Sequence, residues 1–222
     1  KFDAAGRKAL TEDEALAQCV LFLFAGLDTT STELAFAAYL LAINPDAQEK
    51  LRAEIDECFE RHGTDPSLDA INKMPYLNGV VSETLRMYPI GGRAERLAYE
   101  DYTLGDTGVK VPKGCLVAAP VYAMHHDPDN FPDPEKFDPT RFIGDNLSSI
   151  RPYTYLPFGA GPRNCIGNRL ALQTMKVCLV HVLHKVEFSR TENTKVPIEL
   201  CPGFTAVNSN NMTIGIKKRI LS

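Results

Sequence analysis

The 222-residue chain contains no tryptophan, no run of basic residues and no apolar run long enough to cross a membrane. Its longest apolar stretch, residues 19–27, is far shorter than the roughly 20 residues that a membrane helix needs. We therefore expect no transmembrane helix within this chain. The formal net charge of −4 gives no support for nucleic-acid binding, and that class is set aside.

Closely spaced cysteines are also missing. The six cysteines are scattered, with no CxxC pair and too low a density for a disulfide-stapled fold. Their surroundings predict that most are buried, in a reducing compartment. The chain begins at Lys1 without a signal-like segment and enters a long helix almost at once, which favours a piece of a longer protein.

Helical patterns dominate what is present, because 44% hydrophobic residues with 23% charged residues indicate an ordered globular chain. Residues 11–43 predict one long helix, with Thr11 and Glu14 as a capping box. Its middle, residues 19–27, is apolar on every side, which predicts burial across a domain. Further helices are predicted at 45–61, at the surface, at 76–87, and after Cys165 to about His184.

Strands are predicted to be few and short. Extended segments at 95–97, 102–104, 110–111 and 116–119 suggest a small sheet, and residues 195–200 and 212–217 suggest paired strands. Between them, the proline-rich residues 127–162 show little periodicity, which predicts a long ordered meander. The predicted fold class is mainly α with small β-sheets.

The most informative segment is FGAGPRNCIG, residues 158–167. Gly159 and Gly161 allow backbone angles that other residues avoid, and Gly167 leaves room for a flat cofactor. Free amides at the start of the following helix, together with the cation of Arg163, favour the charged form of the Cys165 sulfur. For a lone cysteine, the alternative is a buried and inert thiol.

This segment resembles the ligand loop of the cytochrome P450 family, in which a phenylalanine, two glycines, an arginine, the cysteine and a glycine recur in this order. The matching positions are Phe158, Gly159, Gly161, Arg163, Cys165 and Gly167. The resemblance implies that Cys165 is the axial ligand to the iron of haem b. It also implies the C-terminal half of the cytochrome P450 fold, with residues 1–222 forming part of a single domain.

A second string, AGLDTTS in the long helix, resembles the oxygen site of that family. It implies that Ala25 lies against the haem and that Asp28 and Thr29 relay protons to dioxygen. Gly26 costs about 1 kcal/mol relative to alanine in a helix and suggests a local bulge that makes room for a ligand. The alternative is that Thr29 and Thr30 only bond back to carbonyl groups of the preceding turn.

Glu83 and Arg86 stand three residues apart and share one helix face. On an exposed face such a pair would contribute less than about 1 kcal/mol. However, the string PTRF resembles the meander motif of the family, whose arginine completes a buried triad with that pair. Arg141 occupies this position, and the implied role is structural.

Haem carries two propionates, and arginine suits them because its planar fork binds a carboxylate through two hydrogen bonds. Arg163 is the first candidate. In the string PIGGRAERL, the spacing from Arg86 favours Arg96 over Arg93 as the second. A surface charge is the alternative for either residue.

The four motifs occur in the order of the family, and the surrounding strings look most like its animal microsomal branch, which oxidises drugs and steroids. The resemblance implies a monooxygenase that inserts one atom of O2 into a lipophilic substrate. Electrons would come from NADPH through a reductase, with cytochrome b5 as a further candidate partner. The implied location is the cytosolic face of the endoplasmic reticulum membrane, reached through an anchor upstream of Lys1.

Other candidate surfaces follow from the same resemblance. Phe24, Ala25, Ile90 and the loop around Phe204 would line an apolar substrate pocket. Arg169 and Lys176, seven residues apart on the helix after the cysteine, would meet an acidic reductase. The spacing of Cys178, His181 and His184 spreads them around a helix, so no zinc site is expected there.

Two other functions remain open. A haem-thiolate isomerase or dehydratase would rearrange a peroxide without external electrons, although such enzymes can lack the acid and alcohol represented here by Asp28 and Thr29. A truncated, non-catalytic product is the other alternative, because helices that cover the haem in the family precede this segment.

Overall fold

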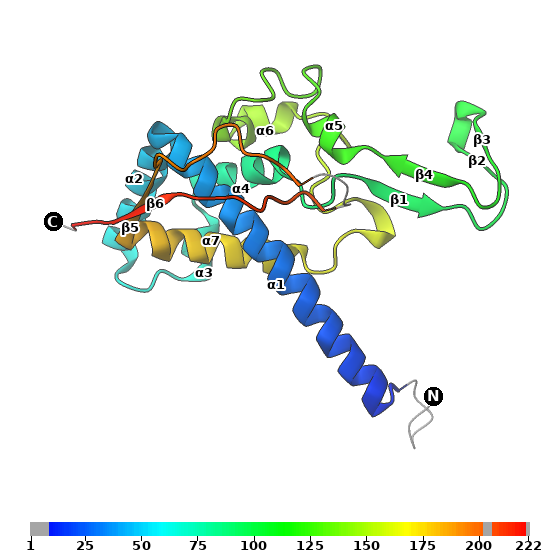
Figure 1. The fold of residues 1–222 in the computed structure, drawn as a ribbon, viewed down its shortest axis with the longest axis horizontal. Coiled ribbons are helices and arrows are strands. Elements are labelled where there is room, and N and C mark those ends of the chain that lie inside the picture. The colour runs from blue at the N-terminus through cyan, green and yellow to red at the C-terminus, as the bar shows by residue number, and fades with distance from the viewer. Residues whose placement is uncertain (1–8, 202–205, 221–222) are drawn as a thin grey trace.

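The computed structural model describes residues 9–201 and 206–220 and is mainly helical (Figure 1). Its α-helices are α1 Glu12–Ile43, α2 Pro45–His62, α3 Leu68–Asn72, α4 Pro75–Met87, α5 Val121–His125, α6 Asp145–Ser149 and α7 Asn168–Lys185. Its strands are β1 Ala94–Leu97, β2 Tyr102–Thr103, β3 Lys110–Val111, β4 Leu116–Ala119, β5 Val186–Ser189 and β6 Gly215–Lys218. Short 3-10 turns span Gly105–Thr107, Pro139–Phe142 and Gly161–Arg163.

The hydrophobic core lies where the second half of α1 meets α2, α4, α7 and β5. Phe36 and Leu40 of α1, Val81 of α4 and Leu183 of α7 are all fully or almost fully buried. Helix α2, predicted at the surface, contributes one buried face through Leu51, Ile55 and Cys58. These positions recur at helical spacing, so α2 is amphipathic and its outer face alone meets solvent.

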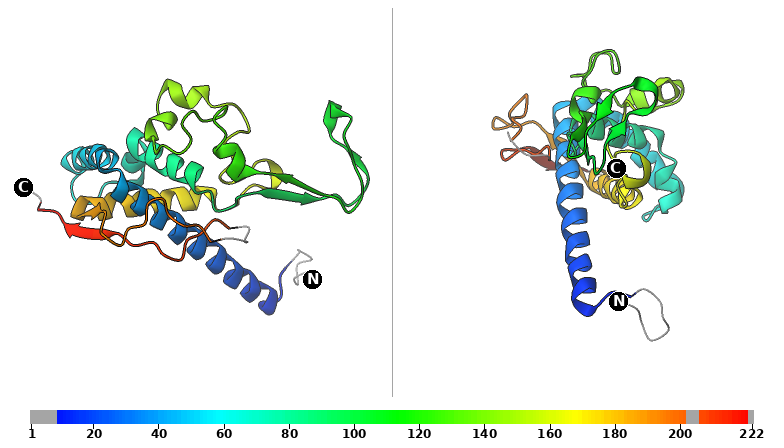
Figure 2. Two further views of the ribbon diagram at one scale, coloured as in Figure 1. Left: turned by 45° about the horizontal axis from the view of Figure 1, so that its top comes forward. Right: turned by 90° about the vertical axis from the view of Figure 1, so that its right-hand side faces the viewer.

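The strands form three separate two-stranded antiparallel pairs. β1 pairs with β4, from Ala94 opposite Ala119 to Leu97 opposite Leu116, and β2 pairs with β3. Together they form an arm that projects from the helical body (Figures 1 and 2). The four predicted segments are therefore confirmed as strands, but they form two pairs rather than one sheet.

The predicted pairing of the tail is partly wrong. Residues 215–218 are a strand, but their partner is β5, which directly follows α7, and not residues 195–200. The Gln48 side chain fixes β5, because its amide donates to the Phe188 carbonyl at 2.8 Å and its carbonyl accepts from the Phe188 N–H at 2.8 Å. Pro197 also removes a donor from the segment that was expected to pair.

Helix α1 begins with the predicted capping box, since the Thr11 hydroxyl accepts from the Glu14 N–H and the Glu14 carboxylate accepts from the Thr11 N–H. The predicted burial of its middle is wrong. Leu21 is 57% exposed and Phe24 is 71% exposed, because no described segment packs over this part of the helix, which projects from the body (Figure 2). By length and composition α1 could cross a membrane, contrary to the sequence expectation, but core helices of soluble proteins pass the same test.

Helix α4 approaches the 3-10 turn at Pro139–Phe142 so closely that Gly79 has no room for a side chain. A Cβ atom there would lie 2.5 Å from the Pro139 carbonyl oxygen and 3.2 Å from Ile143. Overpacking of this kind typically costs about 1–3 kcal/mol.

We predict that Gly79→Ala lowers the free energy of unfolding by about 1–3 kcal/mol, although alanine is the better helix former. Urea unfolding of the two proteins measures the difference. Because the closest contact is a backbone oxygen, Ile143→Ala should not restore the lost stability. A neutral Gly79→Ala, or full rescue by Ile143→Ala, would contradict the close approach.

Candidate functional site

The segment around Cys165 forms a tight turn that presents its sulfur at the surface. Gly159 and Gly161 both adopt positive φ, 69° and 78°, which favours glycine. The Cys165 N–H donates to the Phe158 carbonyl at 2.9 Å and closes the turn. Three residues later α7 begins, with Gly167 at its N-cap.

Cys165 is exposed, unlike a cysteine that only packs in the core. Cys58 is buried and Cys178 and Cys201 are half-buried, whereas Cys19, Cys115 and Cys165 are exposed. The prediction that most cysteines are buried is therefore wrong, and so is the alternative of a buried, inert Cys165. All six are free thiols.

The space beside the Cys165 turn is open. A Cβ atom built on Gly161 or Gly167 would meet nothing within 4 Å. Phe158 is half-buried at the start of the turn, and Arg163 is exposed within it. An exposed sulfur, an aromatic ring and glycines without side chains form a surface that fits a flat macrocycle.

Glu83 and Arg86, behind this turn on α4, form an ion pair in the interior. Both side chains are fully buried, and Arg86 donates from Nε to Glu83 Oε2 at 2.7 Å and from Nη2 to Glu83 Oε1 at 2.9 Å. Burial raises the pKa of Glu83, whereas the hydrogen bonds and the charge of Arg86 oppose that rise. The structure thus places this pair in the core and not on an exposed face.

The meander completes the cluster. Arg141 Nε lies 3.4 Å from Glu83 Oε1, and the N–H of Asp138 donates to the same oxygen at 2.9 Å. Arg86 in turn donates to the carbonyls of His125 at 2.9 Å and Pro134 at 2.7 Å. The three residues expected to form a triad are therefore brought together, and they hold residues 134–141 against α4.

His125 connects this cluster to the segment that leads to Cys165. Its Nδ1 lies 3.1 Å from the Arg86 carbonyl, and its Nε2 accepts from the Leu156 N–H at 2.9 Å. The ring therefore carries its proton on Nδ1 and is neutral. Burial lowers the pKa of His125 to about 4.

Sequence reasoning gave His125 no role, because a histidine before Asp127-Pro128 at a helix end has no distinguishing pattern. Its partners lie 39 and 31 residues away, so only the fold reveals them. Tyr155 reinforces the same link, since its ring stacks on His125 and its hydroxyl donates to the Ser82 carbonyl at 2.9 Å.

The residues expected at the oxygen site, Ala25, Asp28 and Thr29, lie around the midpoint of α1. The Thr29 hydroxyl donates to the Ala25 carbonyl at 2.6 Å, which is the bond back to the preceding turn that the sequence left as an alternative. Asp28 and Ala25 are exposed and Thr29 is half-buried. Because α1 is a continuous α-helix through Gly26, the predicted bulge is not formed.

The two arginines of the segment after α4 differ in their partners. Arg93 Nε pairs with the Glu95 carboxylate at 2.6 Å. Arg96, on β1, is exposed and donates to the Glu95 backbone carbonyl at 2.7 Å, and it pairs with no carboxylate in the described part of the chain. Arg96 therefore has more donors available for an anionic ligand than Arg93.

The expected reductase face on α7 is only partly present. Arg169 is exposed, but Lys176 is half-buried and donates to the Asn72 side chain at 3.2 Å. Burial lowers the pKa of Lys176. Contact between α3 and α7 thus covers the second of the two cations.

The expected pocket residues are spread between surface and core. Phe24 is exposed and Ile90 is half-buried, while Phe204 lies outside the described residues. Beside Ile90, on α1, lies Glu33, which is 3% exposed and was not selected from the sequence. In the sequence, the one feature that could have singled out Glu33 is its position four residues after Thr29.

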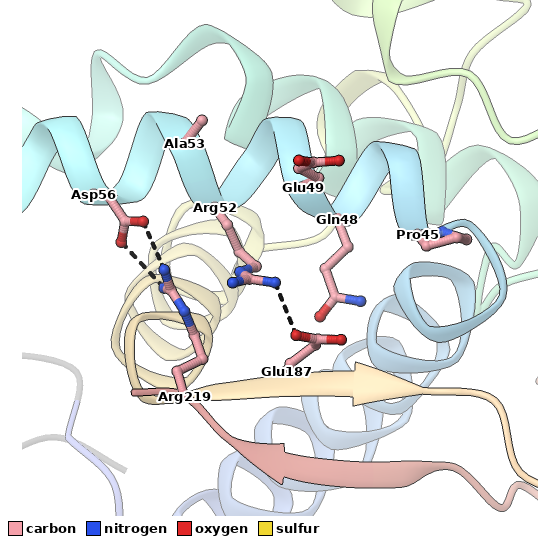
Figure 3. Close-up of a pocket in the computed structure, with 8 residues that line it drawn as sticks. All are labelled: Pro45, Gln48, Glu49, Arg52, Ala53, Asp56, Glu187 and Arg219. Carbon is pink, nitrogen blue, oxygen red and sulfur yellow. Dashed lines mark hydrogen bonds and ion pairs between the residues drawn. The ribbon is translucent and has the colours of Figure 1, made fainter. Parts of the chain in front are cut away.

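A surface groove of about 380 Å³ lies elsewhere, between α2 and the β5–β6 pair (Figure 3). Its charged groups pair with each other, Arg219 with Asp56 at 2.6 Å and Arg52 with Glu187 at 3.0 Å. It lies at the far end of α7 from Cys165, and the 18 residues of that helix span about 27 Å. The groove is therefore not part of the candidate site.

Comparison with known proteins identifies the family of this chain. The Cytochrome P450 family profile matches residues 2–214. Cytochrome P450 3A41 of Mus musculus is 48% identical over 198 residues, which cover 89% of this chain and 39% of that protein. Cytochrome P450 3A31 of Mesocricetus auratus is 50% identical over 193 residues, which cover 87% of this chain and 38% of that protein.

The described residues thus combine an exposed cysteine in a glycine turn with a buried glutamate–arginine cluster. The chain belongs to the cytochrome P450 family. It spans about 39% of the length of the curated relatives that it matches.

We predict that Arg86→Lys lowers the free energy of unfolding by about 3–5 kcal/mol, because lysine cannot reproduce the planar fork and leaves buried acceptors without donors. Urea unfolding measures this loss. The matched control is Arg93→Lys, whose pair with Glu95 is exposed and should change stability by less than about 1 kcal/mol. Equal effects of the two substitutions would contradict the role of the buried cluster.

We predict that His125 contributes to acid lability. Its pKa is lowered in the folded state, so the unfolded state binds its proton first, and stability is lost as the pH falls from about 6.5 to about 4. The loss should reach about 3 kcal/mol. Urea unfolding at pH 7, 5 and 4 should show a flatter dependence for His125→Gln than for the natural chain, and His62→Gln, at an exposed histidine, is the matched control.

Proposed function

We propose that this protein is a haem-thiolate monooxygenase that inserts one oxygen atom from O2 into a lipophilic substrate. The observation that carries the proposal is the exposed Cys165 sulfur in a glycine turn, which the Cys165 N–H closes on the Phe158 carbonyl. Family membership supports the cofactor, haem b. When bound, haem supplies the iron at which dioxygen is activated and reduced.

Cys165 is proposed to hold the haem iron through its thiolate. There an anionic sulfur would supply the electron density that favours cleavage of the O–O bond, which neutral histidine would do less well. Cys165 lies three residues before the first residue of α7. Phe158, Gly159 and Gly167 would pack against the macrocycle, and a Cβ atom built on Gly167 would meet nothing within 4 Å.

Arg163 and Arg96 are proposed to bind the two propionates. Both are exposed, and the donors of Arg96 are not taken up by a carboxylate of the described residues. Fork-like guanidinium groups bind carboxylates through paired hydrogen bonds. Ala25, on the exposed side of α1, would lie against the ring.

Asp28 and Thr29 are proposed to deliver protons. Thr29 donates its own hydrogen to the Ala25 carbonyl, so its oxygen remains free to accept from a water. Asp28 is exposed and can exchange protons with solvent. A lipophilic substrate is supported by the exposed apolar side chains of the same helix, such as Phe24 and Leu27.

The remaining parts of the proposal rest on kinship. The similarity to cytochromes P450 3A41 and 3A31 supports electrons from NADPH through a reductase, with cytochrome b5 as a second candidate partner. It also supports the cytosolic face of the endoplasmic reticulum membrane as the location. Arg169 is the exposed cation on α7 that could face an acidic reductase.

We predict that Cys165→Ser abolishes the ferrous carbon monoxide Soret band that thiolate ligation shifts far to the red of the histidine-ligated band, because serine cannot supply a soft anionic sulfur. The test is a carbon monoxide difference spectrum of the haem-loaded protein. The control is Cys115→Ser, at an equally exposed cysteine next to β4, which should leave the band unchanged.

Retention of the band in Cys165→Ser would overturn the ligand assignment. Turnover of an organic hydroperoxide without NADPH, combined with no NADPH-dependent oxidation, would instead favour the isomerase class.

A further inference from the structure

Glu33 is a carboxyl group in the interior without a partner. It is 3% exposed, and neither of its oxygens accepts or donates a hydrogen bond within the residues that the structure describes. Buried polar groups nearly always have a partner, and an exception points to a water or another molecule that completes the site. Glu33 therefore marks a place where a small polar molecule belongs.

The position of Glu33 links it to Thr29. Residues four apart lie on the same helix face, and helical side chains lean toward the N-terminus, so the Glu33 side chain lies over the turn that carries Thr29. The backbone amide of Ile90 is directed at the carboxyl without closing a hydrogen bond. Tyr155, on the segment that leads to Cys165, lies near enough for its hydroxyl to be influenced by the charge of Glu33.

An unpaired carboxylate in this environment would be costly, because an ion removed from water needs a counter-charge or hydrogen bonds. Burial raises the pKa of Glu33 to about 8, and the Ile90 amide opposes only part of that rise. Burial also raises the pKa of Tyr155, so this neighbour is neutral as well. The segment at Ile90 presents its backbone amide to Glu33. Asp28, the nearby acid on α1, is exposed to solvent.

To pass a proton on, the Thr29 oxygen must accept a hydrogen bond from a second group. Its single hydrogen is held by the Ala25 carbonyl, so the hydroxyl can pass a proton onward only if another group donates to its oxygen. A protonated carboxylic acid is such a group, either directly or through one water. Reductive cleavage of dioxygen consumes protons, so a proton store one turn from Thr29 suits that chemistry.

We propose that Glu33 is a protonated acid that holds a water beside Thr29 and positions the Thr29 hydroxyl for proton delivery. In the step, the O–H bond of Glu33 breaks and an O–H bond forms on the water. The water passes another of its protons to the Thr29 oxygen, and the hydrogen that Thr29 releases would bond to an oxygen atom of the dioxygen under reduction, so that one proton leaves Glu33 and one reaches dioxygen. No electrons move, and the carboxylate regains a proton from solvent. This inference rests on the function proposed above.

The first experiment is infrared spectroscopy of the haem-loaded protein, which requires no turnover. At neutral pH the natural protein should show the carbonyl band of a protonated carboxylic acid, shifted in heavy water. Glu33→Gln should remove the band, Glu33→Asp should move it, and in the natural protein it should fade as the pH rises through about 8. Absence of a band that responds to these substitutions would overturn the proposal.

The second experiment measures coupling, the fraction of consumed O2 that appears in oxidised substrate and not in peroxide. Glu33→Gln should lower coupling several-fold with an unchanged ferrous carbon monoxide band, and Glu33→Asp should restore part of it. The control is Glu54→Gln, because the Glu54 oxygens already accept from the N–H groups of Tyr76 at 2.9 Å and Leu77 at 2.8 Å. Unchanged coupling in Glu33→Gln would show that the carboxyl is only structural.

A third measurement covers the case in which Glu33→Gln fails to load haem. A raised pKa in the folded state means that stability is lost as the pH rises from about 4.5 to about 8. Urea unfolding should therefore show that Glu33→Gln gains stability relative to the natural protein across this range, and a flat difference would contradict the protonated acid. A different result tests the proposed function itself. If the natural protein lacks the thiolate type of carbon monoxide band, both proposals are overturned.

Discussion

The buried Arg86 guanidinium is the constraint on which the rest of the structure depends. A cation without access to water must be surrounded by acceptors, and Arg86 obtains them from Glu83 on its own helix and from the carbonyls of His125 and Pro134. One of these acceptors ends α5 and another, the Pro134 carbonyl, lies in a segment without regular structure. The charge on α4 therefore dictates the path of the chain between α5 and the 3-10 turn at Pro139–Phe142.

The constraint that Arg86 imposes reaches the cysteine turn through contacts between uncharged groups. His125 bonds to Arg86 on one side and to Leu156 on the other, and Tyr155 lies between its ring and Phe142. Two residues after Leu156, the Phe158 carbonyl accepts from the Cys165 N–H. A series of buried and half-buried partners thus runs from an ion pair in the core to an exposed sulfur, and it allows a turn rich in glycine to hold a defined shape.

The sequence predicted those features that follow from short-range spacing or from a motif. The capping box at Thr11, the helix after Cys165, the strands of the arm and the clustering of Glu83, Arg86 and Arg141 could all be anticipated from spacing and motif. His125 and Glu33 could not, because their significance lies in partners, or missing partners, that only the fold determines. The exposure of Phe24 was missed for a related reason, since an apolar pattern predicts that a face is covered but not by which segment.

The central claim is that the Cys165 sulfur binds the haem iron. Resonance Raman spectroscopy tests it most directly, on haem-loaded protein grown with ordinary cysteine and with cysteine carrying a heavy sulfur isotope. The account predicts an iron–sulfur stretching band that moves to lower frequency with the heavy isotope and that disappears only when position 165 is changed. A spectrum without any sulfur-sensitive iron band, or one that persists without Cys165, would contradict it.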